Sequence, residues 1–432
     1  MSSSTLTAPA SPKSLEVNYK RAPKDASVAL LGVLEKFSVA EQVTVRRNAR
    51  QLPKMLVAVW REMYKCLDFE EFQKQLLGDA LKQFVRKMRR HFFSVRFNCD
   101  QLQEQLSLLE RSGIQELPGV HECVVKWDSS KSDCFAKWPL HSLPKLLPHL
   151  HRLELHMPLQ WGFFEQFGRL KWLALHEDVS AEALAAIWLG CGRLKCLQIM
   201  GRGTTDLSGI SKSAKLQELT LPVAAIKEDA ASEIFQLPHL KFLELLQQDA
   251  TAETTLQVIS LVLSRRTMDI KTLRINGSRL GPVDWLRGLE LQRCPRLDGL
   301  MLIDCQFAGM DVTSLGSWPR LCYAAFCHCS DLTDKQVKDF VHGSPLLTQL
   351  YLIGCTQLTT KVLFDLFNMR CIQRLGTPTL GLYLQEGELL HEEFKLNFTK
   401  QTTLELLDTP LDDSHMPNVQ FIFLEAESES AQ

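Results

Sequence analysis

The sequence predicts an α/β solenoid, in which a curved parallel sheet forms the inner layer and helices form the outer layer. A short apolar pattern recurs along the chain at intervals of 20 to 30 residues, and stretches with helical periodicity lie between its copies. The chain has 432 residues, which is long for one compact domain, and an elongated array of repeats accounts for that length.

The recurring pattern is apolar-x-x-apolar-x-apolar. Its copies are LHRLEL from Leu150, LKWLAL from Leu170, LKCLQI from Leu194, LQELTL from Leu216, LKFLEL from Leu240, IKTLRI from Ile270, LDGLML from Leu297, LCYAAF from Leu321 and LTQLYL from Leu347. The last two apolar positions of each copy alternate as a half-buried strand requires. The intervals lie at or near those of leucine-rich repeats, so we predict one short strand per repeat and parallel stacking of neighbours.

Helices are predicted between these strands, on the outer side of the array. Their sequences are AEALAAIWL after Ser180, EDAASEIF after Lys227, TTLQVISLVL after Glu253, DKQVKDFV after Thr333 and KVLFDLF after Thr360. FFSVRFNC from Phe92 and VHECVVKW from Val120 fit two degenerate repeats, and Leu404 and Leu406 fit a last capping strand. The predicted solenoid therefore spans residues 92–410, and it is best defined over residues 150–360.

The later repeats resemble the cysteine-containing subclass of leucine-rich repeats. Cys305, Cys329 and Cys355 follow predicted strands, an L-T-D element precedes one helix, and C-P precedes the strand of LDGLML. The resemblance implies that each of these cysteines tucks its small side chain into the turn after the strand.

The N-terminal region divides into an arm and a helical module. Residues 1–26 are rich in Ser, Pro, Ala and Lys, which predicts a disordered arm. Residues 27–70 carry apolar residues at helical spacing and resemble an F-box, with VWREMYKCLDF from Val59 as the closing stretch. The resemblance implies that this module binds the Skp adaptor of a cullin-based ubiquitin ligase. It assigns that contact to Leu30, Leu31, Leu34, Phe37, Val43, Val45 and Trp60.

Two functions remain open at this stage. F-box modules followed by cysteine-type repeats occur in substrate-recognition subunits of Skp–cullin–F-box ligases, which implies such a role here. The alternative is a leucine-rich-repeat scaffold or regulatory binding protein without a ubiquitin link, whose N-terminal helices cover the first repeat. The two differ in whether Leu34 and Trp60 pack into the solenoid or form an outward apolar patch.

Two further segments flank the predicted array. Residues 71–91 are predicted to form a connecting helix with Leu81, Phe84, Val85 and Met88 on its buried side. Its basic residues, from Lys82 to Arg90, could also contact phosphate or an acidic peptide, although a solvated helix face is the favoured interpretation. Residues 411–432 are the predicted C-terminal tail, and its acidic end, EAESESAQ from Glu425, is predicted to be disordered.

The concave face is the predicted target-binding surface, because side chains beside the buried leucines point to the open side of the sheet. Large apolar or aromatic residues there suggest contact with a partner protein. They are Trp172, Phe242, Leu246, Met301, Ile303, Tyr323, Tyr351 and Ile353. The predicted polar contacts are Arg152, Glu154, His156, His176, Glu218, Glu244, Arg274 and Asn276.

Composition narrows the functional classes. With 49 Lys+Arg against 50 Asp+Glu, the formal net charge of -1 gives no general attraction to nucleic acid or to membranes. Thirteen scattered cysteines and the lack of a secretory signal predict a reduced compartment, the cytoplasm or the nucleus. The expected partners are the Skp adaptor, the cullin scaffold and a target protein. We expect no nucleic acid and no membrane as partners, and a monomer outside the complex.

No catalytic motif is found, so we expect a non-catalytic adaptor without a cofactor. The sequence contains no G-x-S-x-G elbow, and GRGTTDLSG from Gly201 lacks the features of a phosphate-binding loop. Cys322, Cys327, His328 and Cys329 are close in sequence but lack the paired spacing of a zinc site. No metal site is predicted.

Overall fold

The structure is a computed structural model, and it describes most of the chain. The described residues are 32–33, 36–48, 53–76, 78–126, 140–159, 164–202, 206–247, 250–266, 271–282, 284–289, 291, 294, 296–309, 318–372, 377–384, 404–406 and 421–424. Of the predicted adaptor contacts, Leu30, Leu31 and Leu34 lie outside these ranges, as do the predicted arm and the acidic end of the tail.

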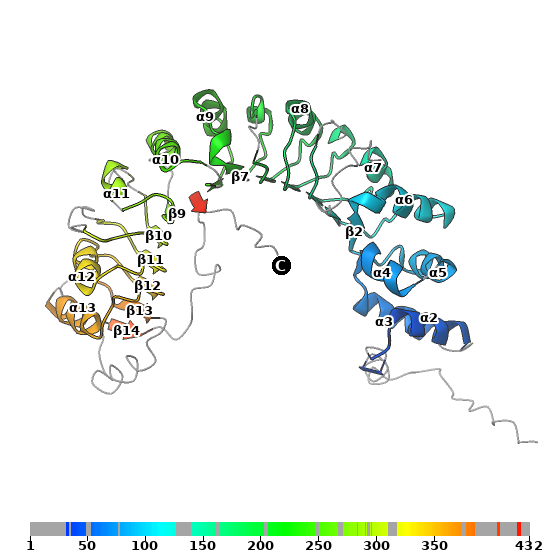
Figure 1. Cartoon of the computed structure of the whole chain (residues 1–432), viewed down its shortest axis with the longest axis horizontal. Helices are drawn as coiled ribbons and strands as arrows, with labels where there is room; N and C mark the ends of the chain where they lie inside the picture. Colours follow the sequence, from blue (N-terminus) through cyan, green and yellow to red (C-terminus); the bar gives the residue numbers. More distant parts are fainter. Residues whose placement is uncertain are drawn as a thin grey trace, which may run out of the picture.

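A parallel sheet lines the inner side of an arc, and helices form its outer side (Figure 1). Its strands are β1 Cys66–Asp68, β2 Ser94–Asn98, β3 Glu122–Lys126, β4 Arg152–Leu155, β5 Trp172–Leu175, β6 Cys196–Ile199, β7 Glu218–Pro222, β8 Phe242–Leu246, β9 Thr272–Asn276, β10 Gly299–Ile303, β11 Tyr323–Cys327, β12 Gln349–Ile353, β13 Leu380–Leu384, β14 Leu404–Leu406 and β15 Phe421–Leu424. The predicted α/β leucine-rich-repeat solenoid is therefore confirmed.

The helices lie between the strands in sequence. They are α2 Val39–Asn48, α3 Pro53–Met63, α4 Phe69–Gln75, α5 Asp79–Met88, α6 Leu102–Arg111, α7 Leu143–Leu146, α8 Ala181–Gly190, α9 Glu228–Phe235, α10 Ala252–Arg266, α11 Trp285–Gly288, α12 Asp334–His342 and α13 Lys361–Ile372. Short 3-10 turns, such as Phe164–Gln166 and Ile210–Lys212, replace a full helix in some repeats. Helices α8, α9, α10, α12 and α13 coincide with the five predicted helical stretches.

The sheet begins earlier in the chain than residue 92. Strand β1 pairs in parallel with β2, with Leu67 opposite Val95. The predicted connecting helix over residues 71–91 is instead two helices, α4 and α5, with Gly78 at φ 49° between them. The segment around β1 holds only three strand residues, too few to show a period of two, so the pattern search missed it.

The C-terminal tail also contributes a strand to the sheet, which the sequence pattern did not predict. The acidic end that is predicted to be disordered, from Glu425, lies outside the described residues. Strand β15 pairs in parallel with both β8 and β9, so the strand order runs β8-β15-β9. Figure 1 shows this strand, coloured red, at the inner side of the arc. Its pairing joins segments far apart in sequence, which local periodicity does not encode.

Candidate functional site

The concave face is built from in-register rows of side chains. One row runs Arg152, Trp172, Cys196, Glu218 and Phe242 across strands β4 to β8. The next row runs Glu154, Ala174, Gln198, Thr220 and Glu244. Because strand residues alternate between the two faces, these rows point away from the buried leucines between them. The predicted target-binding residues thus share one surface.

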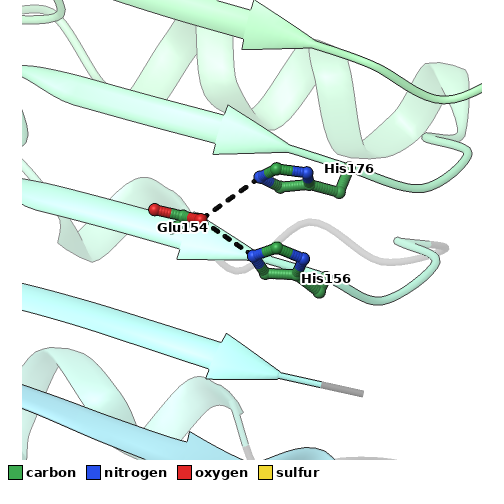
Figure 2. Close-up of side chains that lie close together, drawn as sticks. All are labelled: Glu154, His156 and His176. Atoms are coloured by element: carbon green, nitrogen blue, oxygen red, sulfur yellow. Dashed lines mark hydrogen bonds and ion pairs between the residues drawn. The ribbon is translucent and has the colours of Figure 1, made fainter. Parts of the chain in front are cut away.

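At the N-terminal half of this face, the carboxylate of Glu154 contacts two histidines (Figure 2). Its Oε1 lies 2.8 Å from Nε2 of His156 and 3.3 Å from Nε2 of His176. The two imidazole rings are stacked, with centroids 3.7 Å apart and planes 12° from parallel. The structure therefore gathers three residues that the sequence placed separately on the concave face.

Backbone pairing fixes the positions of the two histidines just beyond the ends of β4 and β5. The amide of His156 donates to the carbonyl of Val125 at 2.9 Å, and that of His176 donates to the carbonyl of Leu155 at 3.0 Å. Each strand's ladder thus continues for one more residue. The side chains of His156 and His176 are half-buried, as is that of Glu154.

The two histidines hold the Glu154 carboxylate in its ionised form. Hydrogen bonds from His156 and then His176 lower the pKa of Glu154 far below its ordinary value, and they outweigh the opposing effect of burial. Arg152 contacts the other carboxylate oxygen at 3.8 Å, and its guanidinium carbon lies 3.5 Å from the centre of the Trp172 ring. This cation–π contact orients Arg152 toward Glu154.

In the middle of the face, Glu244 is half-buried and accepts a hydrogen bond from Thr220 at 2.8 Å. Burial raises the pKa of Glu244, while this hydrogen bond and the charge of Arg274 act in the opposite direction. Asn276 caps a turn, since its Oδ1 accepts from the amide of Ser278 at 2.9 Å. Glu218 is exposed and Phe242 is half-buried, so both are open to a partner.

Toward the C-terminal half, the concave face becomes apolar. Met301, Ala325, Cys327 and Tyr351 are buried in a cluster of their own, separate from the main core. The half-buried residues that pack against this cluster are Ile303, Tyr323, Ile353 and Tyr383. Tyr351 lies between Tyr323 and Tyr383. The centroid of its ring is 5.4 Å from that of Tyr323 and 5.7 Å from that of Tyr383. Met301 and Tyr351 thus support the surface from within, and the half-buried members form its accessible part.

Tyr383 was missed in the sequence because the strand LGLYL lies beyond the last well-defined repeat. The signal that could have found it is register. Tyr351 pairs with Tyr383 across β12 and β13, so an aromatic residue stands at the equivalent position of consecutive strands.

The N-terminal helices pack into the solenoid through Trp60. Its side chain is fully buried, its ring lies edge-on to Phe84 of α5 at 5.0 Å, and its Nε1 donates to Oε1 of Gln42 at 2.8 Å. Gln42 in turn donates through Nε2 to the carbonyl of Phe37 and to the hydroxyl of Tyr64, both at 2.9 Å. This buried network fixes α2 and α3 against the first repeat.

The predicted adaptor contacts therefore divide into two groups. Val43 and Trp60 are buried in the chain's own core, and Val45 is half-buried. Phe37 is 41% exposed, and its neighbour Val33, which the sequence analysis did not single out, is 53% exposed. An apolar edge thus remains open at the start of the helical module.

The cysteines of the later repeats stack in the turns, as the resemblance to cysteine-type repeats implied. The thiol of Cys329 donates to the carbonyl of Leu302 at 3.7 Å, and that of Cys355 donates to the carbonyl of Phe326 at 3.5 Å. The hydrogen bond between the thiols of Cys355 and Cys329, followed by burial, raises the pKa of Cys355 above its ordinary range. Burial also raises the pKa of Cys327, to about 12, so this thiol is protonated at neutral pH.

Comparisons with known proteins show low similarity throughout. No protein-family model matches the sequence, and no curated protein matches it either. Within the described part of the chain, none of the helices has the length and apolar character needed to cross a bilayer.

Three solved structures illustrate the structural matches. The crystal structure of Rad7 and Elc1 complex in yeast has 14% identity and a TM-score of 0.40, covering 95% of this chain and 100% of that one. An internalin from Listeria monocytogenes has 14% identity and a TM-score of 0.34, covering 70% and 84%. The leucine-rich repeat-containing protein LegL7 from Legionella pneumophila has 11% identity and a TM-score of 0.38, covering 75% and 95%.

Proposed function

We propose that this chain is a recognition subunit of a Skp–cullin–F-box ubiquitin ligase. The observation that carries the proposal is the continuous hydrophobic core that joins the N-terminal helices to the repeat array. A protein bound to the helices and a protein bound to the concave face would be held at a fixed separation. Proximity of this kind raises the effective concentration of one partner at the other. The chain then needs no catalytic group, and catalysis belongs to the partner subunits.

The target would bind the concave face in two chemically different zones. The zone around Arg152 and Glu154 offers charge, imidazoles and an indole ring. The zone around Tyr323 and Tyr383 offers half-buried aromatic rings supported by a buried cluster. Aromatic anchors beside oriented polar groups are typical of protein-binding surfaces.

The adaptor would bind the exposed apolar edge formed by Val33 and Phe37. Both side chains are exposed to solvent, while the buried Trp60 packs against Phe84 and fixes the helices to the first repeat. An apolar edge on a rigid support suits the docking of another subunit, because little conformational entropy is lost on binding.

A second candidate function is a leucine-rich-repeat scaffold without a ubiquitin link. The burial of Trp60 against Phe84 favours it, because helices that cover the open end of the first repeat need no adaptor to explain them. Such capping protects the exposed core of a terminal repeat. The two functions differ in what binds to Phe37.

The test is a binding titration between the full-length chain and purified Skp adaptor. Phe37→Asp and Val33→Asp place charge on the exposed edge without entering the core, whereas a Trp60 substitution or removal of residues 27–70 would disrupt the fold. Ile372→Asp, at an 86% exposed position on α13, is the matched control. We expect binding by the wild-type chain and the control, and at least tenfold weaker binding by both edge variants. A well-folded wild-type chain that does not bind favours the scaffold.

A further inference from the structure

Glu154, His156 and His176 have the donor set of a transition-metal site. Among the described residues, they form the group of three metal-ligating side chains whose donor atoms lie within 4.8 Å of one another. Two imidazole nitrogens and one carboxylate oxygen suit Zn²⁺ and its neighbours in the first transition series. We propose that this cluster binds one divalent transition-metal ion, with Zn²⁺ as the representative.

The distances between the donor atoms support this proposal. Ligands of a tetrahedral Zn²⁺ ion with bonds of about 2.1 Å lie about 3.4 Å apart. Oε1 of Glu154 lies 2.8 Å from Nε2 of His156 and 3.3 Å from Nε2 of His176. The separation from His176 matches that value, the one from His156 is shorter, and all three ligand atoms lie within 4.8 Å of one another. Small side-chain adjustments would therefore bring the donors around one ion.

The orientation of the rings requires a modest adjustment. The two imidazoles are stacked and nearly parallel, so each must turn about its Cβ–Cγ bond for the Nε2 lone pairs to converge on one ion. That rotation is open to both, because 26% of the His156 side chain and 27% of the His176 side chain are exposed. The backbone amides of both histidines stay paired to neighbouring carbonyls, which fixes the origin of each side chain.

Arg152 is the charged group that faces the cluster from the same strand. It lies nearest Oε2 of Glu154, at 3.8 Å, and it rests on the Trp172 ring, so Oε1 remains directed at the histidines. A partner on the second carboxylate oxygen orients a metal-ligating carboxylate. Arg152 is therefore a positioning residue. Its charge, added to that of the ion, favours an anionic group at the remaining coordination positions.

Three protein ligands leave at least one position open on the ion, and the cluster lies on the concave face. A carboxylate, thiolate or imidazole of a bound protein is the class of ligand that this position would take. This last step rests on the proposed function, whereas the metal site itself does not depend on it.

A second pair of stacked histidines has no carboxylate partner among the described residues. His121 and His151 are stacked at 5.2 Å on neighbouring repeats, and the Nδ1 of His121 lies 3.1 Å from the carbonyl of His149. Burial, followed by the charges of Lys171 and other basic groups, lowers the pKa of His151. Substitution of this pair therefore removes two histidines without touching the proposed site.

The experiment is a Zn²⁺ titration of the full-length chain after removal of bound metal with a chelator. Glu154→Gln, His156→Asn and His176→Asn are compared with the control double variant His121→Asn/His151→Asn, each checked for folding by circular dichroism. We expect one site in the wild type and the control, and at least tenfold weaker binding in each of the three single variants. Absence of Zn²⁺ binding by the wild type would overturn the proposal, and so would wild-type affinity in the three single variants.

A second readout uses Co²⁺ in place of Zn²⁺, because bound Co²⁺ reports its ligands through visible absorption. We expect an absorption band of low-symmetry nitrogen and oxygen ligation in the wild type and the control, and its loss in Glu154→Gln. A sulfur-to-metal charge-transfer band would assign the ion to cysteines and contradict the proposal. Because no target or adaptor is present in either experiment, failure of this site is distinguishable from failure of the proposed function.

Discussion

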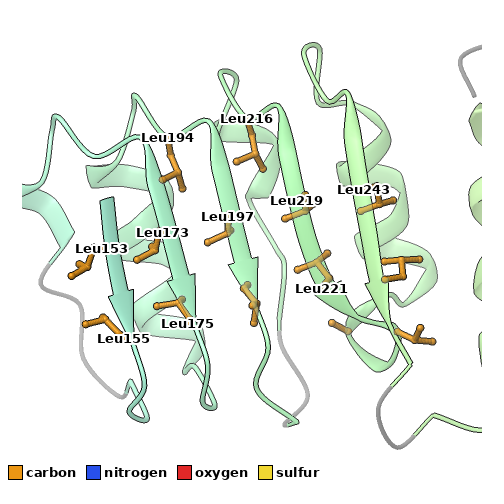
Figure 3. Packing of buried hydrophobic residues seen from close by; sticks show 14 of the residues in the cluster. Leu153, Leu155, Leu173, Leu175, Leu194, Leu197, Leu216, Leu219, Leu221 and Leu243 are labelled. Carbon is orange, nitrogen blue, oxygen red and sulfur yellow. The ribbon is translucent and has the colours of Figure 1, made fainter. Parts of the chain in front are cut away.

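Leu219 and Leu243 occupy equivalent positions on β7 and β8, and both point into the core between sheet and helices (Figure 3). Truncating either to Ala leaves a cavity that the closely packed neighbours fill only in part. We expect Leu219→Ala and Leu243→Ala each to lower the free energy of unfolding by about 2 to 5 kcal/mol, measured by urea denaturation. Leu189→Ala, at an exposed position on α8, is the control and should change it by less than about 0.5 kcal/mol. Near-neutral effects at both core positions would contradict the repeat register.

Glu244 provides a pH-dependent prediction. Its pKa in the folded chain is raised above the ordinary value of 4.5, mainly by burial, so the folded state binds its proton more tightly than the unfolded state does. Ionised Glu244 therefore costs stability once the pH exceeds its raised pKa, and this cost disappears below about pH 4.5. Glu244→Gln keeps an acceptor for Thr220 and should gain stability relative to the wild type as the pH rises through this window.

The measurement is urea denaturation of the wild type and Glu244→Gln at a series of pH values. Glu218→Gln, at an exposed position in the adjacent strand, is the control, and its difference from the wild type should stay within about 0.5 kcal/mol. A stability difference for Glu244→Gln that shrinks with rising pH would contradict the assigned direction of the pKa shift.

The positions of the residues around Glu154 could be predicted from the sequence, but the geometry of their side chains could not. The sequence placed Glu154, His156 and His176 on the concave face, because L-E-L-H and L-A-L-H follow equivalent strand positions 20 residues apart. Parallel register brings the two histidines side by side, which comparison of the repeats could have indicated. The rotamers that aim both rings at one carboxylate oxygen depend on packing, which the sequence pattern does not contain.

At the scale of elements, strand β15 is the unexpected component of the sheet. It separates β8 from β9, with Ile422 opposite both Glu244 and Arg274. The interval between Leu240 and Ile270 is the longest between the predicted repeats, and it contains the 15-residue helix α10. A wider repeat at this point accommodates an additional strand, but the spacing of the repeats does not identify the segment that forms it.

Removal of residues 419–432 should expose the facing edges of β8 and β9. The backbone groups that pair with β15 would lose their hydrogen-bond partners, so we expect faster hydrogen exchange in peptides covering Phe242–Leu246 and Thr272–Asn276. Peptides covering β5 and β6 should be unaffected. Removal of residues 425–432 alone is the control, since it retains β15. Unchanged exchange in β8 and β9 after the longer truncation would show that the strand pairing does not protect them.

At the scale of the whole molecule, the N-terminal helices and the array share one core. The main cluster of buried residues extends from Val39 in α2 to Leu404 in β14. The predicted boundaries at residues 70 and 92 therefore do not separate folding units. The repeats could be located from their periodicity. The packing of Trp60, which joins the N-terminal helices to the repeats, could not be predicted from the change between a helical and a repeat pattern.

The proposed function depends on this shared core, because it requires two binding surfaces at a fixed separation. The test is a distance measurement by double electron–electron resonance between two spin labels. One label replaces Thr44, exposed on α2, and the other replaces Glu218, exposed on the concave face. Non-canonical amino acids carry the labels, so the native cysteines stay unmodified. We predict one narrow distance distribution, unchanged by Phe37→Asp. A broad or bimodal distribution in the wild-type chain would mean that the helices move independently of the repeats, which would rule out a rigid shared core.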